Sequence, residues 1–330
     1  MPQRRLPAMT EPTLNYVHCP GAAASPGTTT EGEGGHRMAY WEWNATGDPA
    51  HPHVVVCVHG LTRQGRDFDV LARRLARHAR IVCPDVAGRG RSDWLADASH
   101  YQIPVYAADM LALLGHLHVR APVRVLDWVG TSMGGLIGMA LCGQPELPLP
   151  APVRRLVLND VGPTLEWPAL QRIGQYVGRV VEFSSVAAAV EGLRIVSTGF
   201  GPHTAEEWQA LSEPLLRPQP DGSVRLHYDP AIAENFRNLT PESARAGDAQ
   251  LWQLYDAIRA RTLVLRGAES DLLLPATTQA MAQRGPRARV VEWPGVGHAP
   301  TLVAAEQVDV VEQFLFGAGQ GGPGAVEARP

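Results

Sequence analysis

The sequence predicts an α/β fold, a mostly parallel β-sheet covered by helices on both faces. Short apolar runs rich in β-branched residues alternate with longer segments at helical spacing, the pattern that parallel sheets and their crossover helices produce. A chain of 330 residues with 45% hydrophobic residues can bury the core of one large domain. The alternation stops once, between Pro163 and Gly247, where only helical stretches and a turn follow. We therefore expect one α/β domain with a helical insertion.

The expected strands are bounded by turn residues. They contain short, nearly continuous apolar runs, which are typical of strands buried on both faces of a sheet. Six fall at His53–Val58, Arg80–Pro84, Val123–Trp128, Val153–Asn159, Arg261–Arg266 and Arg289–Glu292, after a more polar and antiparallel stretch around Arg37–Trp43. Helices are expected at Phe68–His78, Val105–Leu117, Gly134–Cys142, Ala276–Gln283 and Ala304–Phe316, and within the insertion at Ala169–Val181, Val186–Ile195 and Ala205–Leu216.

These elements divide the chain into a core, a cap and two tails. Residues 37–162 and 248–316 would form the α/β core, and residues 163–247 a helical cap over the carboxyl ends of the strands, where ligands bind in open α/β sheets. Residues 1–36 and 317–330 are rich in Gly and Ala, with Pro and Thr in the first segment, and they lack a hydrophobic period. We expect both segments to be disordered.

Composition and charge exclude several partners. The formal net charge is −4 and no cluster of basic residues could follow a phosphate backbone, so nucleic acid is not an expected partner. No stretch of about 20 apolar residues could span a membrane, and the N-terminus lacks the apolar core of a secretory signal. A cytoplasmic protein is the expectation, and the sequence indicates no oligomeric state.

The sharpest motif is Gly-Thr-Ser-Met-Gly at residues 130–134, between a predicted strand and a helix rich in small residues. A G-x-S-x-G turn in that context strains the backbone of its serine and exposes the hydroxyl at the edge of the sheet. Ser132 is therefore the candidate nucleophile. The N–H of Met133 begins the helix, where developing negative charge is stabilised, so it is a candidate oxyanion donor.

A second oxyanion donor is expected after the first long core strand. That strand ends in His59-Gly60-Leu61, and the backbone N–H of Leu61 is the candidate. His59 could in principle act as the base. A histidine one step beyond a buried strand more often braces its loop by hydrogen bonding, and we interpret His59 in that way.

A serine hydroxyl needs a general base within hydrogen-bond reach. Of the 12 histidines, His298 alone occupies a loop after the last predicted strand, between Gly295 and Gly297 on one side and an amphipathic helix on the other. His298 is the candidate base.

The base in turn needs a carboxylate that fixes its tautomer and stabilises its charged form. Asp271 lies in the loop after the penultimate strand and gives the chain order Ser, Asp, His, so we select it. Two alternatives stay open: Glu269 in the same loop, and Asp160 directly after the strand that ends at Asn159.

With these residues in order, the chain resembles the α/β-hydrolase superfamily over about residues 37–316. The loop at residues 84–93, with its aspartate and glycines, looks like the tight loop that follows an early strand in that family. The chain is most similar to small bacterial serine carboxylesterases with a helical cap, whose relatives include lactone, carbon–carbon bond and polyester hydrolases.

The resemblance implies hydrolysis of carboxylic esters through an acyl-enzyme, without a metal or another cofactor. It implies a small-molecule ester as the partner, and the absence of an evident cationic pair in the cap favours neutral short- to medium-chain esters, oligoesters or polyesters. Enol-lactone or carbon–carbon bond hydrolysis is an alternative. An acyltransferase and a ligand-binding receptor that retains the triad without turnover are also compatible with these residues.

Overall fold

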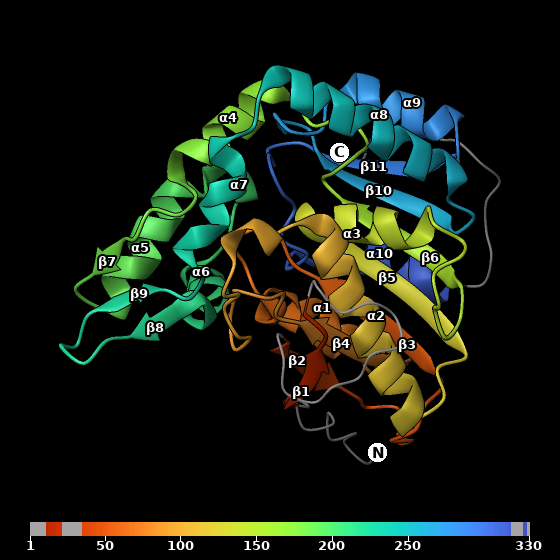
Figure 1. Ribbon diagram of the computed structural model, residues 1–330, viewed down its shortest axis with the longest axis horizontal. Coiled ribbons are helices and arrows are strands. Elements are labelled where there is room, and N and C mark those ends of the chain that lie inside the picture. Colours follow the sequence, from red (N-terminus) through yellow and green to blue (C-terminus); the bar gives the residue numbers. More distant parts are fainter. Residues whose placement is uncertain (1–10, 22–34, 318–325, 329–330) are drawn as a thin grey trace, which may run out of the picture.

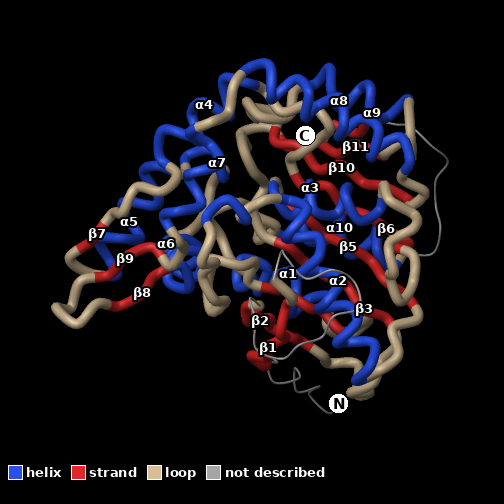
Figure 2. The backbone as a smooth tube through the Cα atoms, in the orientation of Figure 1, coloured by secondary structure: helices blue, strands red, loops and turns tan. Residues whose placement is uncertain are grey.

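A central sheet with helices on both faces forms the body of the molecule, and a smaller helical cap projects from one side of it (Figures 1 and 2). This computed structural model describes residues 11–21, 35–317 and 326–328. Among them, nine strands form the central sheet in the order β1-β2-β4-β3-β5-β6-β10-β11-β12. They are β1 (Thr13–Cys19), β2 (His36–Trp43), β3 (His53–Val58), β4 (Arg80–Pro84), β5 (Val125–Thr131), β6 (Val153–Asn159), β10 (Arg261–Gly267), β11 (Arg289–Trp293) and β12 (Val326–Ala328).

Strand β2 is antiparallel to both of its neighbours, β1 and β4, whereas every other neighbouring pair is parallel. The core lies in two layers, because successive side chains of a strand point to opposite faces. In β3, Val54 and Val56 enter the larger hydrophobic cluster, and Val55 and Cys57 enter the smaller one.

Each layer of the core is closed by its own helices. The larger layer holds buried side chains of α2 (Ile103–Arg120), α3 (Met133–Cys142), α8 (Pro241–Ala257) and α9 (Pro275–Gln283), and the smaller layer those of α1 (Asp69–Leu75) and α10 (Ala305–Phe316). The predicted fold class is therefore confirmed, with β3, β4 and β6 at the expected bounds and β2 antiparallel as expected.

The cap consists of short helices and a small separate sheet (Figure 2). Its elements are α4 (Trp167–Tyr176), β7 (Glu182–Phe183), α5 (Val186–Val196), α6 (Ala205–Ser212), β8 (Leu216–Pro218), β9 (Val224–Leu226) and α7 (Glu234–Arg237), and the sheet has the order β7-β9-β8. The expected end of the cap at Gly247 is wrong, since Gly247 lies inside α8, a helix that begins at Pro241 and packs on α3. A Cβ on Gly247 would meet no atom within 4 Å, so this glycine serves no close packing contact.

The expectation of disorder at the two ends needs a correction. Residues 13–19 form β1, which pairs with β2 over seven residue pairs. Val17 and Cys19, two residues apart and therefore on the same face of the strand, are buried. Residues 326–328 form β12, which pairs with β11. The rest of that expectation, for residues 1–10, 22–34, 318–325 and 329–330, lies outside the described residues.

Candidate active site

Ser132 lies at the sharp turn from β5 into α3, with backbone angles of φ 50° and ψ −114°. The turn is tight enough to require glycine on both sides. A Cβ on Gly130 would lie 2.3 Å from the carbonyl carbon of Gly134, and one on Gly134 would lie 2.0 Å from the carbonyl oxygen of Val58. The G-x-S-x-G pattern therefore follows from the close approach of β5, α3 and β3.

His298 faces Ser132 from the loop between β11 and α10. Its Nε2 lies 3.0 Å from the Ser132 Oγ, and its Nδ1 lies 2.7 Å from the Oδ2 of Asp160. The His298 side chain is 16% exposed, and that of Asp160 is fully buried. Because an ionised carboxylate only accepts hydrogen bonds, this arrangement puts the imidazole proton on Nδ1 and directs the Nε2 lone pair at the serine hydroxyl.

Asp160 occupies the place that we expected Asp271 to take beside His298. It directly follows β6 and has a left-handed backbone, with φ 53°. Its carboxylate also accepts hydrogen bonds from the Gly267 N–H at 2.9 Å and from the Ser270 hydroxyl at 2.6 Å. Three donors therefore converge on this buried carboxylate, as a buried charge requires.

Asp271 lies outside this hydrogen-bond chain, so the prediction that Asp271 pairs with His298 is wrong. Its carboxylate is half exposed and forms a bidentate pair with Arg172 of α4, at 2.7 and 2.8 Å. Partial burial raises the pKa of Asp271, but the hydrogen bonds and charge of Arg172 outweigh that effect and hold it below its ordinary value. Asp271 thus joins the cap to the core. Glu269, the other carboxylate in this loop, has no hydrogen bond to His298 in the described chain.

Chain order could not separate these aspartates, because both Asp160 and Asp271 lie between the serine and the histidine. The sheet order separates them, since β6 lies between β5 and β10 and brings Asp160 between Ser132 and Gly267. The sequence patterns do not identify Ser270. Its only signal is its position next to Asp271, in the loop after the strand where a carboxylate is expected.

The loop after β3 lies beside Ser132, as the position of an oxyanion donor requires. A Cβ on Gly60 would lie 3.7 Å from the Cβ of Ser132, so the Gly60–Leu61 peptide adjoins the serine. Met133 is the first residue of α3, and its N–H is one of the helix N–H groups that have no partner within the helix. Both expected donors, Leu61 and Met133, thus adjoin the nucleophile.

His59 braces the same loop, as interpreted from the sequence. Its Nδ1 lies 2.7 Å from the Gly60 carbonyl oxygen, and its Nε2 accepts a hydrogen bond from the Val86 N–H at 3.0 Å. The side chain is fully buried, and this burial lowers its pKa to about 3. A neutral His59 therefore ties the loop after β3 to the loop after β4.

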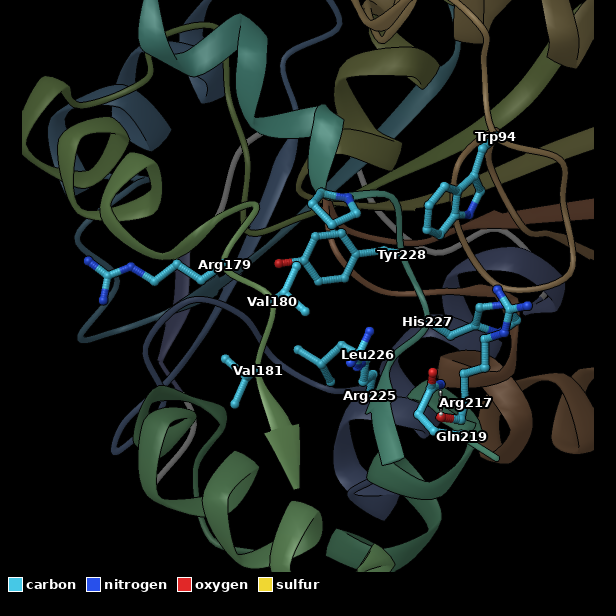
Figure 3. A pocket seen from close by; sticks show the side chains of 11 residues that line it. Trp94, Arg179, Val180, Val181, Arg217, Gln219, Arg225, Leu226, His227 and Tyr228 are labelled. Atoms are coloured by element: carbon cyan, nitrogen blue, oxygen red, sulfur yellow. Dashed lines mark hydrogen bonds between the residues drawn. The ribbon is translucent and has the colours of Figure 1, made fainter. Parts of the chain in front are cut away.

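A separate cavity of about 180 Å³ is lined by residues of the cap and by Trp94 of the core, and neither Ser132 nor His298 lines it (Figure 3). Its walls carry apolar side chains, the cationic side chains of Arg179, Arg217 and Arg225, and the imidazole of His227. Burial, followed by the charges of Arg217 and Arg91, lowers the pKa of His227 to about 4. Cations that are far apart in the sequence thus gather in the cap, which the sequence did not indicate.

One group of potential metal ligands occurs in the described chain, outside the hydrogen-bond chain of Ser132, His298 and Asp160. Ligand atoms of Cys19, His36 and Asp109 lie within 4.8 Å of one another and are buried. Burial and the nearby Asp109 raise the pKa of the Cys19 thiol far above its ordinary value, and His36 pairs with Asp109 at 3.1 Å. The His36–Asp109 pair accounts for this cluster by joining β2 to α2.

Comparison with known proteins identifies the family of the chain. A model of the alpha/beta hydrolase family matches residues 55–311. A 3-hydroxybutyrate-oligomer hydrolase of Cupriavidus necator is 49% identical over 310 residues, 93% of this chain and 99% of that protein. A pimeloyl-[acyl-carrier protein] methyl ester esterase of Xanthomonas axonopodis pv. citri is 27% identical over 80% of this chain and 96% of its own length.

Among solved structures, an alpha/beta hydrolase from Novosphingobium aromaticivorans superimposes with a TM-score of 0.77 and 32% identity, covering 94% of this chain and all of that one. No helix within the described residues is both long and apolar enough to cross a membrane. The family match over most of the core and the near full-length relatives lead to one conclusion: the chain belongs to the alpha/beta hydrolase family.

Proposed function

We propose that this protein hydrolyses short oligoesters of hydroxy acids through an acyl-enzyme on Ser132. The observation that carries the proposal is the chain of hydrogen bonds from Ser132 Oγ through His298 to Asp160. A serine at a strained turn, a base within reach and a buried carboxylate behind the base are the parts that acyl transfer needs. Asp160 replaces Asp271 in this proposal.

The reaction would proceed in two balanced steps. His298 Nε2 takes the proton of Ser132 as Oγ attacks the ester carbonyl, and the N–H groups of Leu61 and Met133 bind the oxyanion. When the tetrahedral intermediate collapses, His298 protonates the leaving alcohol oxygen. Water then attacks the acyl-enzyme by the same route and releases the acid and free Ser132.

The substrate class is supported by the relative from Cupriavidus necator. That protein is named for 3-hydroxybutyrate oligomers, and the two chains align over nearly their whole lengths at 49% identity, so the cap is included in the likeness. An oligomer of a hydroxy acid offers an ester carbonyl to Ser132 and a hydroxyl as the leaving group. Linear dimers and trimers of 3-hydroxybutyrate are therefore the proposed substrates.

A substrate panel tests this proposal. Purified protein is incubated with 3-hydroxybutyrate dimer and trimer, p-nitrophenyl butyrate, an enol-lactone and a carbon–carbon bond substrate, and products are quantified by chromatography. We expect release of 3-hydroxybutyrate from the oligomers, and a loss of at least about 10³-fold in the Ser132→Ala variant. Ser99→Ala, at an exposed serine, is the matched control and should keep full activity.

Other outcomes would assign other functions. Preferred turnover of the enol-lactone or the carbon–carbon substrate would contradict the oligoester proposal while keeping the triad. More transferred than hydrolysed product, in the presence of an added alcohol, would indicate an acyltransferase. A lack of turnover on every ester, with no labelling of Ser132 by a fluorophosphonate, would leave a ligand-binding receptor.

A further inference from the structure

Arg89 is a fully buried arginine that the proposed reaction steps do not use. It lies in the loop after β4, and its guanidinium donates to the carbonyl oxygens of Leu61 at 2.8 Å and Ala87 at 2.7 Å and to the Tyr106 hydroxyl at 2.9 Å. It also contacts the Sδ of Met133 at 3.5 Å. Within the described chain, none of its hydrogen-bond partners is a carboxylate, and it forms no ion pair.

The lack of an anionic partner distinguishes Arg89 from other buried arginines of the chain. Arg80 pairs with Glu42 at 2.7 Å, and Arg266 pairs with Glu292. A buried charge without a counter-charge is costly, and it persists only where hydrogen bonds or function compensate. The ring faces of Tyr106 and Tyr101, whose centroids lie 5.0 and 5.7 Å from the guanidinium carbon, compensate in part.

Two of the four groups that Arg89 holds belong to the residues whose N–H groups would bind the oxyanion. Nε bonds the carbonyl of Leu61, in the loop after β3, and Nη2 contacts the side chain of Met133, at the start of α3. One rigid, planar group therefore spans both halves of the proposed oxyanion hole. Its position controls how far apart those halves lie.

The charge of Arg89 also has the sign that the transition state needs. The ester is neutral in the ground state, whereas the tetrahedral intermediate carries a negative oxygen between the N–H groups of Leu61 and Met133. A fixed positive charge in a region that excludes water stabilises the intermediate more than the bound ester. Such an effect appears in kcat, and it leaves KM nearly unchanged.

The backbone around Arg89 is fixed by the cap. Arg89 forms a β-bridge with Tyr228, the Gly90 N–H donates to the His227 carbonyl at 3.0 Å, and the Asp229 N–H donates to the Gly88 carbonyl at 2.8 Å. A Cβ on Gly90 would lie 2.3 Å from a carboxylate oxygen of Asp85, so the loop has no freedom on that side either. The guanidinium is thus held in place before substrate arrives.

We propose that Arg89 is a positioning residue that sets the geometry of the oxyanion hole and supplies positive potential to the tetrahedral intermediate. This inference rests on the proposed function. It predicts that replacing Arg89 weakens the binding of the intermediate selectively, while the binding of uncharged ligands at the same site is retained.

Two inhibitors that differ in one group measure this selectivity. Ser132 Oγ adds to the carbonyl carbon of a trifluoromethyl ketone with a butyryl-like chain, and the carbonyl oxygen becomes an oxyanion. The corresponding methyl ketone binds at the same site without this addition. We expect Arg89→Met to lower kcat roughly 100-fold, with KM within about threefold, and to reduce the ratio of trifluoromethyl to methyl ketone affinity by about the same 100-fold. Arg89→Lys keeps the charge but cannot span Leu61 and Met133, and about a tenfold loss in both quantities is expected.

Arg80→Met is the matched control, because it also removes a buried arginine but lies at the opposite end of β4. It should leave the ketone ratio unchanged. If Arg89→Met does not give a native circular dichroism spectrum, Arg89→Lys decides the question by the same ratio. A ratio within about threefold of wild type in the folded Arg89 variants, or an equal loss in Arg80→Met, would overturn the inference.

The proposed function is tested separately by the wild-type protein. Wild-type turnover of esters together with an unchanged ketone ratio in the Arg89 variants rejects only the role of Arg89. A wild-type protein that hydrolyses no ester rejects the proposed function, and the inference that depends on it.

Discussion

Two residues of the proposed triad, Ser132 and Asp160, have the left-handed backbone that side chains other than glycine rarely adopt. Hydrogen bonds to neighbouring strands hold both in this conformation. The Ser132 N–H donates to the Asn159 carbonyl at 2.9 Å, and the Asp160 N–H donates to the Leu265 carbonyl at 2.8 Å. Each strained residue is thus fixed by the next strand of the sheet, as expected where strain serves a site.

The roles of the two aspartates can be separated by substitution. Asp160→Asn should lower kcat by about 10³- to 10⁴-fold, because an amide can no longer hold the His298 tautomer or stabilise its charged form. Asp271→Asn should stay within about threefold of wild type, since Asp271 pairs only with Arg172 at a half-exposed position. Steady-state kinetics on 3-hydroxybutyrate dimer would measure both.

The control for Asp160→Asn is its unfolding transition in urea, which shows whether the variant remains folded. If Asp271→Asn were nearly inactive and Asp160→Asn were active, Asp271 and not Asp160 would be the acid of the triad.

At the scale of elements, the parallel strands were predictable and the edges were not. β3 and β4 are buried on both faces, and their continuous apolar runs predict their bounds, whereas in β6 the apolar run covers only residues 156–158. β1 has an exposed face, with only Val17 and Cys19 buried, so its signal is weak until its partner β2 is known. β7, β8 and β9 are two or three residues long, too short for a period to be visible.

The same limit applies to the site. Local patterns predict four site residues, and the structure brings them together: Ser132, His298, Leu61 and Met133. The identity of the carboxylate that pairs with His298 depends on which strand lies next to β5. The order of strands in the sheet determines this neighbour, and the order of residues in the chain does not. Arg89 was overlooked because its significance lies in contacts with residues 28 and 44 positions away.

The connection that His59 makes between the loops after β3 and β4 predicts a pH effect on stability. Its pKa, lowered by burial to about 3, lies below the ordinary value of 6.5, so the folded state binds fewer protons than the unfolded state between these limits. The stabilisation is complete above pH 6.5 and is lost as the pH falls toward 3. The slope approaches about 1.4 kcal/mol per pH unit within this window.

His59→Gln removes this titration. We expect the variant to be less stable than wild type at pH 7, and its free energy of unfolding in urea to change less between pH 6.5 and pH 4.5. His100→Gln, at a side chain that is 43% exposed, controls for the loss of a histidine as such. An identical pH slope in wild type and His59→Gln would refute the prediction.

At the scale of the molecule, the cap is fastened to the core at several points around the site. Arg172 pairs with Asp271, the Arg63 guanidinium donates to the Leu211 carbonyl at 3.0 Å, and the Gly297 N–H donates to the Gly199 carbonyl at 2.7 Å. The last contact adjoins His298 directly. Movement of the cap would therefore act on the loop that carries the base.

A further connection between the core and the cap can be tested at Tyr101. Its buried hydroxyl donates to Asp229 of the cap at 2.6 Å and accepts from the Leu95 N–H at 2.8 Å. Tyr101→Phe leaves both groups without that partner, and we expect it to lower the free energy of unfolding in urea by about 2 kcal/mol. Tyr16→Phe, at a half-exposed tyrosine of β1, should leave it nearly unchanged. An equal effect of the two substitutions would contradict the prediction.

The pairing of β1 with β2 has a consequence for how the protein is handled. The composition of residues 1–36 suggests a tail that could be removed. However, β1 pairs with the outer edge of β2 over seven residue pairs. A protein shortened to residue 37 would present the unpaired N–H and C=O groups of β2 to solvent, where a strand of another molecule could add to them. Removal of β1 would thus move the edge of the sheet to β2, most of whose residues are buried, and we expect the shortened protein to aggregate more readily than the full chain.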